Sequence, residues 1–163
     1  MGPEIRRRMR GAGLFVVEDH LLVSRAEGDQ RWAVIGGGVE PGEAAYRACE
    51  REFREEVGLA VRCQRLALVG DIIIRSNDRL EQDVCFYFVV TAPQQASDMA
   101  AVASQESGLE VGWLSLTELE RAPLVPRSLE ALVPRLLAGE RTLYATYDCR
   151  THPDERTGTH IWP

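Results

Sequence analysis

Apolar and polar residues alternate along much of the chain, in segments separated by Gly, Pro, Asn and Asp. Alternation of this kind, rich in β-branched and aromatic residues, is typical of half-buried strands. It predicts strands over residues 10–18, 21–26, 32–35, 61–75, 84–91 and 110–114. Residues 18–20 and 76–78 are predicted turns, and residues 93–107 form a polar, Ala-rich loop of mixed order.

Three segments follow a helical pattern instead. Residues 44–57 contain no Pro or Gly and are rich in helix formers, and Gly58 is a suitable residue just past a helix end. A second helix is predicted over residues 129–138, ending at Gly139, and a short one starts within residues 116–121. Strands before and after a central helix, followed by a C-terminal helix, indicate a mixed sheet covered on both faces.

The predicted central helix carries three acids on one face. At about 100° per residue, Glu52, Glu55 and Glu56 share a side of the helix. The same side holds the apolar stripe that should pack on the protein, formed by Ala45, Ala48, Cys49 and Phe53. The opposite, solvated side is predicted to hold Arg47, Glu50, Arg51 and Arg54.

Three acids beside an apolar stripe need a counter-charge. Like charges at helical spacing repel, and a partly buried carboxylate has to pair or bind a metal. Mg²⁺ prefers oxygen ligands, keeps several waters and is shared with substrate phosphates. The alternative is an ordinary charged face neutralised by arginines, and the residues around the helix decide between the two.

The stretch from Gly37 to Leu59 matches the pattern G-x5-E-x7-R-E-U-x-E-E-x-G-U at every fixed position, where U is a bulky apolar residue. It resembles the box of the Nudix hydrolase family, of the MutT-like kind. The resemblance implies an α+β Nudix fold, an α/β/α sandwich around a mixed β-sheet, over about residues 10–140. It also implies that Arg51 orients the box carboxylates and that Glu43 ties the loop to the helix.

What the resemblance implies for chemistry is metal-dependent hydrolysis of a phosphoanhydride bond in a nucleoside diphosphate-linked substrate. The expected catalytic residues are Glu52, Glu55 and Glu56. The expected ligands of Mg²⁺, with Mn²⁺ as a substitute, are the same three acids and the backbone carbonyl of Gly36. The general base is left open between a box glutamate and two acids that precede the late predicted strand region, Glu106 and Glu110.

Substrate signatures of several family branches are missing. No Pro lies between Pro41 and Pro93, as ADP-ribose hydrolases would have, and the first Tyr after the box is Tyr87, too far along for diadenosine polyphosphate hydrolases. Residues 21–25 match a coenzyme A hydrolase pattern only in part. Nucleoside di- or triphosphates and nucleotide sugars therefore remain. The alternatives are a non-catalytic nucleotide-sensing module, which usually loses box acids, and an isoprenoid diphosphate isomerase, for which no Cys here has independent support.

Composition fits one enzyme domain. The 163 residues form a single domain, in which residues 141–163 are a C-terminal extension, and His152, His160 and Trp162 there are expected to pack or lie exposed. A net charge of −6 argues against a nucleic-acid partner. All basic residues except His are Arg, so a phosphate-binding P-loop lysine and a Schiff-base lysine are excluded.

The remaining sequence features concern location and partners. The four cysteines are widely spaced and indicate neither zinc nor a disulfide framework. No apolar run approaches the roughly 20 residues of a membrane span, and the N-terminus lacks a signal-peptide plan. We therefore expect a cytoplasmic protein with a small-molecule nucleotide substrate and no membrane partner. A homodimer is left open.

Overall fold

A computed structural model describes residues 5–76, 79–92, 98–139 and 141–162. Its strands are β1 (Ile5–Leu14), β2 (Val16–Val17), β3 (His20–Ala26), β4 (Trp32–Val34), β5 (Gly36–Gly38), β6 (Arg62–Ser76), β7 (Arg79–Thr91), β8 (Leu109–Ser115), β9 (Leu124–Val125), β10 (Leu143–Asp148) and β11 (His160–Trp162). Its helices are α1 (Ala45–Val57), α2 (Leu129–Ala138), α3 (Glu155–Gly158) and the 3₁₀ turns η1 (Met99–Ala101) and η2 (Leu119–Arg121).

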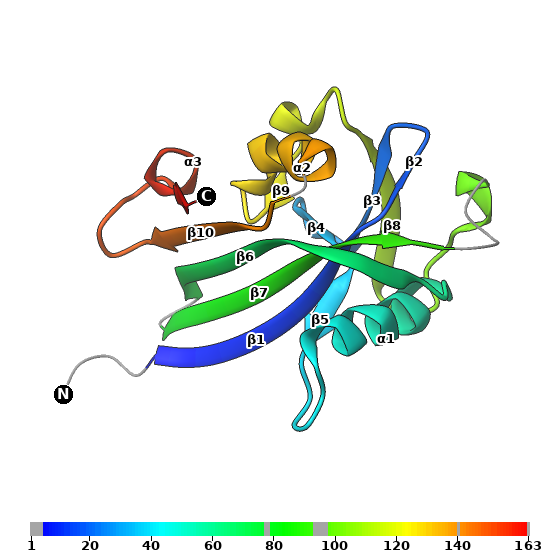
Figure 1. Ribbon diagram of the computed structural model, residues 1–163, viewed down its shortest axis with the longest axis horizontal. Helices are drawn as coiled ribbons and strands as arrows, with labels where there is room; N and C mark the ends of the chain where they lie inside the picture. Colours follow the sequence, from blue (N-terminus) through cyan, green and yellow to red (C-terminus); the bar gives the residue numbers. More distant parts are fainter. Residues whose placement is uncertain (1–4, 77–78, 93–97, 140, 163) are drawn as a thin grey trace.

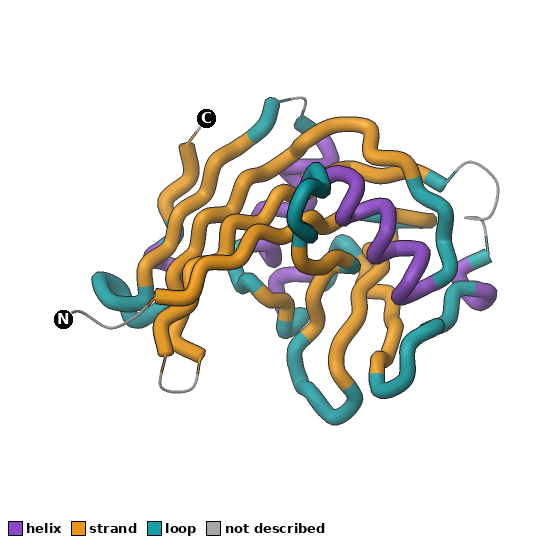
Figure 2. Tube along the Cα trace, turned by 90° about the horizontal axis from the view of Figure 1, so that it is seen from below, coloured by secondary structure: helices purple, strands orange, loops and turns teal. Residues whose placement is uncertain are grey.

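The strands form two mixed sheets (Figures 1 and 2). The six-stranded sheet has the order β11-β10-β6-β7-β1-β5, with β1 parallel to β7 and β10 parallel to β6. The other sheet has the order β2-β3-β4-β9, and β8 pairs with β3. The chain passes from one sheet to the other between β4 and β5, which brings the glycine-rich strand to the edge of the six-stranded sheet.

The two longer helices pack on separate apolar cores, as the helix–sheet–helix prediction requires. Cys49, Phe53 and Val57 of α1 pack in a core with Phe15 and Leu22. The buried side chains of α2 belong to a second core, which also contains Leu14, Leu68 and Tyr87, together with Leu129, Leu132, Val133 and Leu136 from the helix itself. The fold class predicted from the resemblance is confirmed.

Two glycines of β1 allow α1 to lie directly on the sheet. A Cβ at Gly11 would lie 2.0 Å from the carbonyl oxygen of Ala45, the first residue of the helix. A Cβ at Gly13 would lie 2.5 Å from the ring of Phe53. Because both positions lack a side chain, the backbone of the helix approaches the strand closely, and this contact fixes the position of the acidic face.

Most predicted elements are present, with shifted ends. The central helix starts at Ala45 and ends at Val57, and Gly58 adopts a left-handed φ of 70°, as expected of a C-terminal glycine. The predicted strand over residues 10–18 is divided at Phe15 and begins earlier, at Ile5. The turn at residues 18–20 has positive φ at Glu18 and Asp19, whereas Asn77 and Asp78 of the other predicted turn lie outside the described residues.

Residues 141–162 continue the six-stranded sheet. β10 runs parallel to β6, with Tyr144 opposite Val69, and β11 forms the outer edge. Trp162 is 55% exposed, and His152 bonds locally to the backbone of Asp154. Among the described residues, none of the helices combines the length and apolarity needed to cross a membrane.

Candidate active site

The glycine-rich strand β5 lies against the acidic face of α1. A Cβ at Gly37 would lie 2.2 Å from Oε1 of Glu52, so the absence of a side chain allows this carboxylate to reach the strand. A Cβ at Gly36 would lie 2.5 Å from the Cα of Ala12 on the neighbouring strand β1. The glycines therefore allow the strand backbone and the Glu52 carboxylate to approach each other closely.

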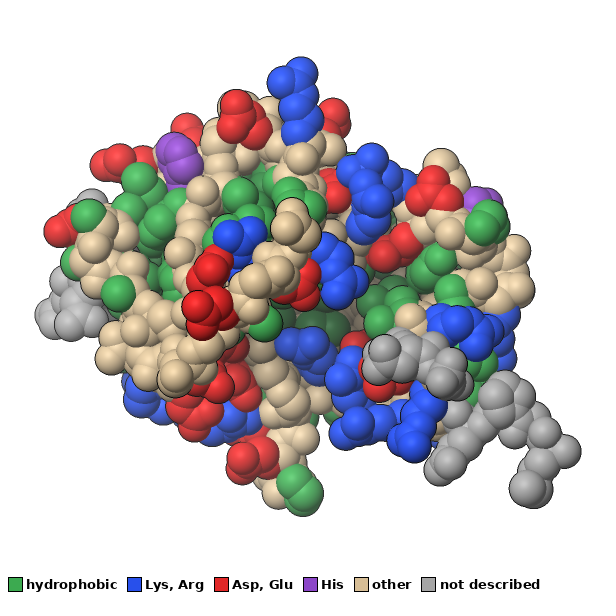
Figure 3. Space-filling view, turned by 180° about the vertical axis from the view of Figure 1, so that it is seen from behind, with side chains coloured by type: hydrophobic (Ala, Val, Ile, Leu, Met, Phe, Trp, Pro, Cys, Tyr) green, Lys and Arg blue, Asp and Glu red, His purple; other side chains and the backbone are tan. Residues whose placement is uncertain are grey.

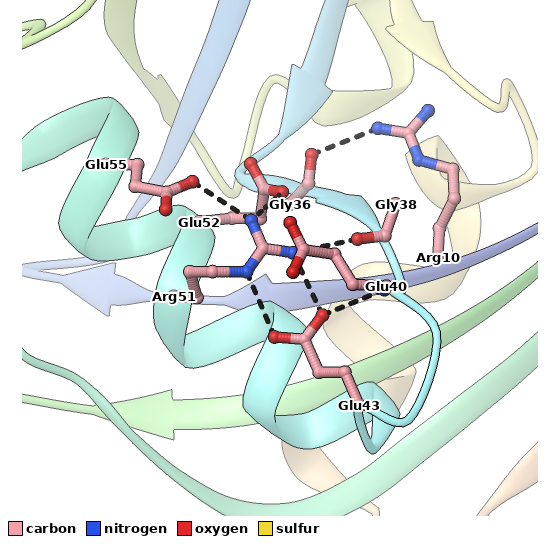
Figure 4. A network of polar contacts seen from close by, with 8 residues as sticks. All are labelled: Arg10, Gly36, Gly38, Glu40, Glu43, Arg51, Glu52 and Glu55. Atoms are coloured by element: carbon pink, nitrogen blue, oxygen red, sulfur yellow. Dashed lines mark hydrogen bonds and ion pairs between the residues drawn. The ribbon is translucent and has the colours of Figure 1, made fainter.

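Arg51, in the middle of α1, is the centre of a polar network that reaches the loop before the helix (Figure 4). Its guanidinium donates to Glu43 with Nε and Nη2 at 3.0 Å each, to Glu52 at 2.7 Å and to Glu55 at 2.9 Å. It also donates to the carbonyl of Gly38 at 2.9 Å. These contacts raise the pKa of Arg51 and lower the pKa of Glu43. Arg51 therefore holds three carboxylates and the loop, which is the arrangement that the resemblance implies.

Glu43 also binds the loop to the helix, although it precedes α1 rather than lying in the first turn. The helix begins at Ala45, and the Glu43 carboxylate accepts the backbone N–H of Glu40 at 3.0 Å. Glu52 and Glu55 turn toward Arg51. Within the described parts of the chain, three acidic, His or Cys side chains do not converge on one point. The box acids thus occupy one helix face without forming a closed ligand cage.

Glu56 differs from the other box acids because it is buried. Only 7% of the residue is exposed, and its Oε2 accepts a hydrogen bond from Ser24 Oγ at 2.9 Å. Among the residues that the structure describes, no basic side chain lies within ion-pair distance of it. Burial, reinforced by the charges of Glu52 and Glu106, raises the pKa of Glu56 to about 7, although the Ser24 hydrogen bond opposes the rise.

The helical-wheel prediction for Glu50 was wrong. Instead of lying on a solvated side, this residue is 7% exposed, because β6 covers that side of α1. Its carboxylate accepts the backbone N–H of Cys63 at 3.2 Å. Two guanidinium groups, those of Arg47 and Arg62, lie 3.6 Å from it. Glu50 is therefore a buried acid with its own arginine partners and has no part in the acidic face.

The two candidate bases outside the box differ in their surroundings. The negative charge of Glu106 contributes to the raised pKa of Glu56. The residue before it, Gln105, donates its backbone N–H to the Glu56 carbonyl at 2.7 Å. Glu110 lies on β8 and is bound to Arg25 of β3 at 2.6 Å. The structure therefore brings Glu106 close to the box acids, whereas Glu110 is already neutralised by an arginine.

Two residues of this site were not predicted from sequence. Ser24 interrupts the apolar pattern of β3, and its burial beside Glu56 explains the interruption. Arg10 of β1 donates to the carbonyl of Gly36 at 3.0 Å. It also lines a cleft between the two sheets, whose other walls include Val34, Ile72, Ile74, Asp83, Tyr87 and Val125. In the sequence, Arg10 stands out only as one of four arginines within residues 6–10.

The donor atoms on this helix face and on the glycine strand are of the kind that suits a hard divalent cation. Glu52, Glu55, Glu56 and the Gly36 carbonyl offer only oxygen atoms, which Mg²⁺ and Mn²⁺ prefer. Three carboxylates contact the guanidinium of Arg51, and the negative charge of Glu52 also acts on a fourth, that of Glu56. Negative charge is therefore in excess over the single positive charge of Arg51. The buried carboxylate of Glu56 lacks a basic partner in the described chain. A cation would supply that missing counter-charge.

Comparisons with known proteins identify the family. A family model of the NUDIX domain matches residues 7–136. An uncharacterised Nudix hydrolase of Bacillus subtilis, YvcI, is 23% identical over 130 residues, covering 80% of this chain and 79% of the relative. A mouse diphosphoinositol polyphosphate phosphohydrolase, 3-alpha, is 36% identical over 74 residues, covering 45% of this chain and 43% of its own length.

Solved structures show the same fold. The MutT protein from Bacillus halodurans superposes with a TM-score of 0.64 at 18% identity, covering 86% of this chain and 89% of that one. The family match spans most of the chain and includes the whole acidic helix and its glycine strand. The chain belongs to the Nudix family and is a Nudix pyrophosphohydrolase.

Proposed function

We propose that the chain hydrolyses a phosphoanhydride bond in a nucleoside diphosphate-linked substrate, either a nucleoside di- or triphosphate or a nucleotide sugar, with Mg²⁺ as cofactor and Mn²⁺ as a substitute. The observation that carries the proposal is the buried carboxylate of Glu56, which has no basic partner in the described chain and lies beside other oxygen donors. Enzymes of the family generally use divalent cations. The site carries an excess of negative charge, which such an ion would neutralise.

The residues divide the work in the following way. Glu52, Glu55, Glu56 and the Gly36 carbonyl hold the cation, and Arg51 fixes the orientation of Glu52 and Glu55. When bound, the cation neutralises charge on the phosphates and lowers the pKa of a coordinated water. Glu106, whose charge reaches Glu56, is the favoured proton acceptor outside the box. Ser24 holds one oxygen of Glu56 in place.

The cleft between the sheets is the proposed seat of the organic part of the substrate. It begins at Arg10, next to the Gly36 carbonyl, and continues between apolar side chains of β4, β6 and β9. Binding sites for nucleotides commonly combine apolar walls with a few fixed polar groups. A substrate that lies in this cleft places its phosphates toward Gly36 and the acidic face of α1.

The test is a substrate panel with defined products. Nucleoside triphosphates, nucleotide sugars and a diphosphoinositol polyphosphate are incubated with Mg²⁺, with Mn²⁺ and with EDTA. The mouse relative's name justifies the last substrate, and a nucleoside triphosphatase, NudI from Escherichia coli, 61% identical over 28 residues, justifies the first. We expect a nucleoside monophosphate plus pyrophosphate or a phosphorylated leaving group.

Reaction in ¹⁸O-labelled water distinguishes the mechanism. Direct attack of water puts the label on one phosphorus, without exchange through a phospho-enzyme. Release of free nucleoside as the first product, or a trapped phospho-enzyme, would contradict the proposal. Tight, metal-dependent binding of a nucleotide without any turnover would instead identify a sensing module.

A further inference from the structure

Arg10 lies where the cation and the substrate would meet. It belongs to β1, at the position opposite Gly38 of β5, and its side chain is half-buried. Nη2 donates a hydrogen bond to the carbonyl oxygen of Gly36 at 3.0 Å (Figure 4). This oxygen is the backbone ligand assigned to the metal in the proposed function. A positively charged side chain is therefore bound to an atom that a cation would also use.

Arg10 differs from its neighbour Arg8 on the same face of the strand. Arg8 is neutralised by Asp83, with two hydrogen bonds of 2.8 Å, and by Glu81 at 2.9 Å. Within the described residues, Arg10 has no carboxylate at ion-pair distance. The titratable side chains that its charge affects are Cys85 and Tyr87, both buried. Most of its five N–H donors thus stay available for an anion.

The surrounding surface carries further positive charge. Figure 3 shows arginine side chains gathered toward the end of the molecule where β1 begins, and acidic side chains gathered near the loop that leads into α1. Arg10 lies between these two regions, because it is on β1 and reaches the glycine strand. A phosphorylated substrate would thus have cations on the side opposite the acidic helix.

We propose that Arg10 changes partner during binding: it holds the Gly36 carbonyl when the metal is absent and binds a substrate phosphate when the metal is present. The inference rests on the proposed function, because it takes Gly36 as a metal ligand and a diphosphate as the substrate. A guanidinium and a divalent cation that share one oxygen repel each other strongly in a partly buried site. Arg10 therefore opposes metal binding until an anion draws it away.

Thermodynamic linkage gives this exchange a definite consequence. If Arg10 weakens metal binding in the empty site and strengthens phosphate binding, metal and substrate bind cooperatively. The planar fork of arginine suits the second role, because it can donate two hydrogen bonds to a phosphate, whereas lysine offers a point charge. Replacing Arg10 should then change metal binding and substrate binding in opposite directions.

The experiment compares Arg10→Met, Arg10→Lys and a control, Arg7→Met. Arg7 is an exposed residue of the same strand, so its replacement removes the same charge without affecting Gly36. Binding of Mn²⁺ to substrate-free protein is measured by electron paramagnetic resonance of the free ion. The KM of a substrate identified in the panel is measured at saturating Mg²⁺, and circular dichroism checks the fold of each variant.

For Arg10→Met we expect Mn²⁺ to bind about tenfold more tightly, a usual size for coupling between two sites. Its KM should rise by about 10- to 100-fold, as for the loss of hydrogen bonds to a charged group. Arg10→Lys should bind Mn²⁺ like the wild type, because it keeps the charge, and show a raised KM. Arg7→Met should match the wild type in both measurements.

The opposite results overturn the inference. Mn²⁺ binding to Arg10→Met that is unchanged or weaker would show that Arg10 does not oppose the cation, and an unchanged KM would show that it does not bind substrate. If Arg10→Met fails to fold, the Arg10→Lys variant decides through its KM. Failure of the proposed function would appear in the wild type itself, as hydrolysis that persists in EDTA or as no hydrolysis at all.

Discussion

Two glutamates of this molecule are almost equally buried but have very different surroundings. Glu56 of α1 is 7% exposed and Glu130 of α2 is 4% exposed. Glu130 lies 2.5 Å from Arg156 and 3.7 Å from Arg127. Glu56 accepts a hydrogen bond from the hydroxyl of Ser24 and has no basic partner in the described residues. Glu50, also buried, lies near two arginines and resembles Glu130.

We interpret the difference as that between a structural acid and an acid that serves the proposed function. A buried carboxylate is costly unless a positive charge accompanies it. At Glu130 and Glu50 the protein supplies that charge itself, through two arginines near each carboxylate. At Glu56 no described residue supplies it, and the negative charges of Glu52 and Glu106 make the need for it larger. Such an omission is expected where the counter-charge is a ligand, since a permanent arginine would compete with it.

Removal of metal should have the largest effect. We expect EDTA to abolish hydrolysis of every substrate that the enzyme accepts, and excess Mg²⁺ or Mn²⁺ to restore it, because no basic side chain among the described residues pairs with Glu56. Product release is measured by chromatography before and after metal is added back. Undiminished turnover in metal-free buffer would show that the missing charge at Glu56 has another explanation.

The variant Glu56→Gln should lower kcat by at least about 100-fold, in line with the loss of a metal-assisted step of several kcal/mol. It keeps the shape of the side chain and removes its charge. Mn²⁺ binding should weaken in parallel, as measured by electron paramagnetic resonance. Turnover equal to that of the wild type would remove Glu56 from the proposed ligands.

The stability of the metal-free protein should fall as pH rises, because of Glu56. Its pKa is about 7 in the folded state and near 4.5 when unfolded. Between these values the folded state keeps a proton that the unfolded state has lost, so unfolding becomes easier as pH rises. The pKa difference corresponds to ~3 kcal/mol, present in full below pH 4.5 and lost above pH 7.

This effect is isolated by comparing wild type with Glu56→Gln in EDTA, using urea unfolding at several pH values. The variant should become the more stable protein as pH rises from 5 to 8. A difference that does not change with pH would mean that Glu56 is ionised throughout this range, and a variant that is less stable at pH 8 would mean that the carboxylate is an ion-pair partner.

Sequence patterns predicted the parts of this site that depend on local structure. Helix α1 was predicted to within one residue, because its composition, its periodicity and Gly58 are local signals. The shared face of Glu52, Glu55 and Glu56 followed from helical geometry alone. The family resemblance then added the Gly36 carbonyl as an expected metal ligand, which no periodicity would have connected to the helix. That the glycines form strand β5 was not predicted.

The errors and omissions that affect the site concern contacts between distant parts of the chain. A helical wheel divides the helix into two sides, but α1 has β1 on one side and β6 on another, so Glu50 is buried as well. Ser24 and Arg10 reach the site only through the arrangement of strands. The parallel pairing of β10 with β6 joins residues more than 70 positions apart, which alternation alone cannot predict.

The last and smallest effect concerns the acid that the protein neutralises itself. We expect Glu130→Gln to lower the free energy of unfolding by about 1–2 kcal/mol, because it removes a charged hydrogen-bond acceptor from Arg156. The loss stays modest because the Arg156 side chain is 44% exposed and can return to water. Urea unfolding measures the change, and kcat and KM should match the wild type, since α2 packs on a different core from α1.

In metal-free buffer at pH 8, Glu130→Gln should therefore destabilise the protein while Glu56→Gln stabilises it. If both variants shift stability in the same direction, the arginines around Glu130 do not offset its burial, and the distinction between the two glutamates fails.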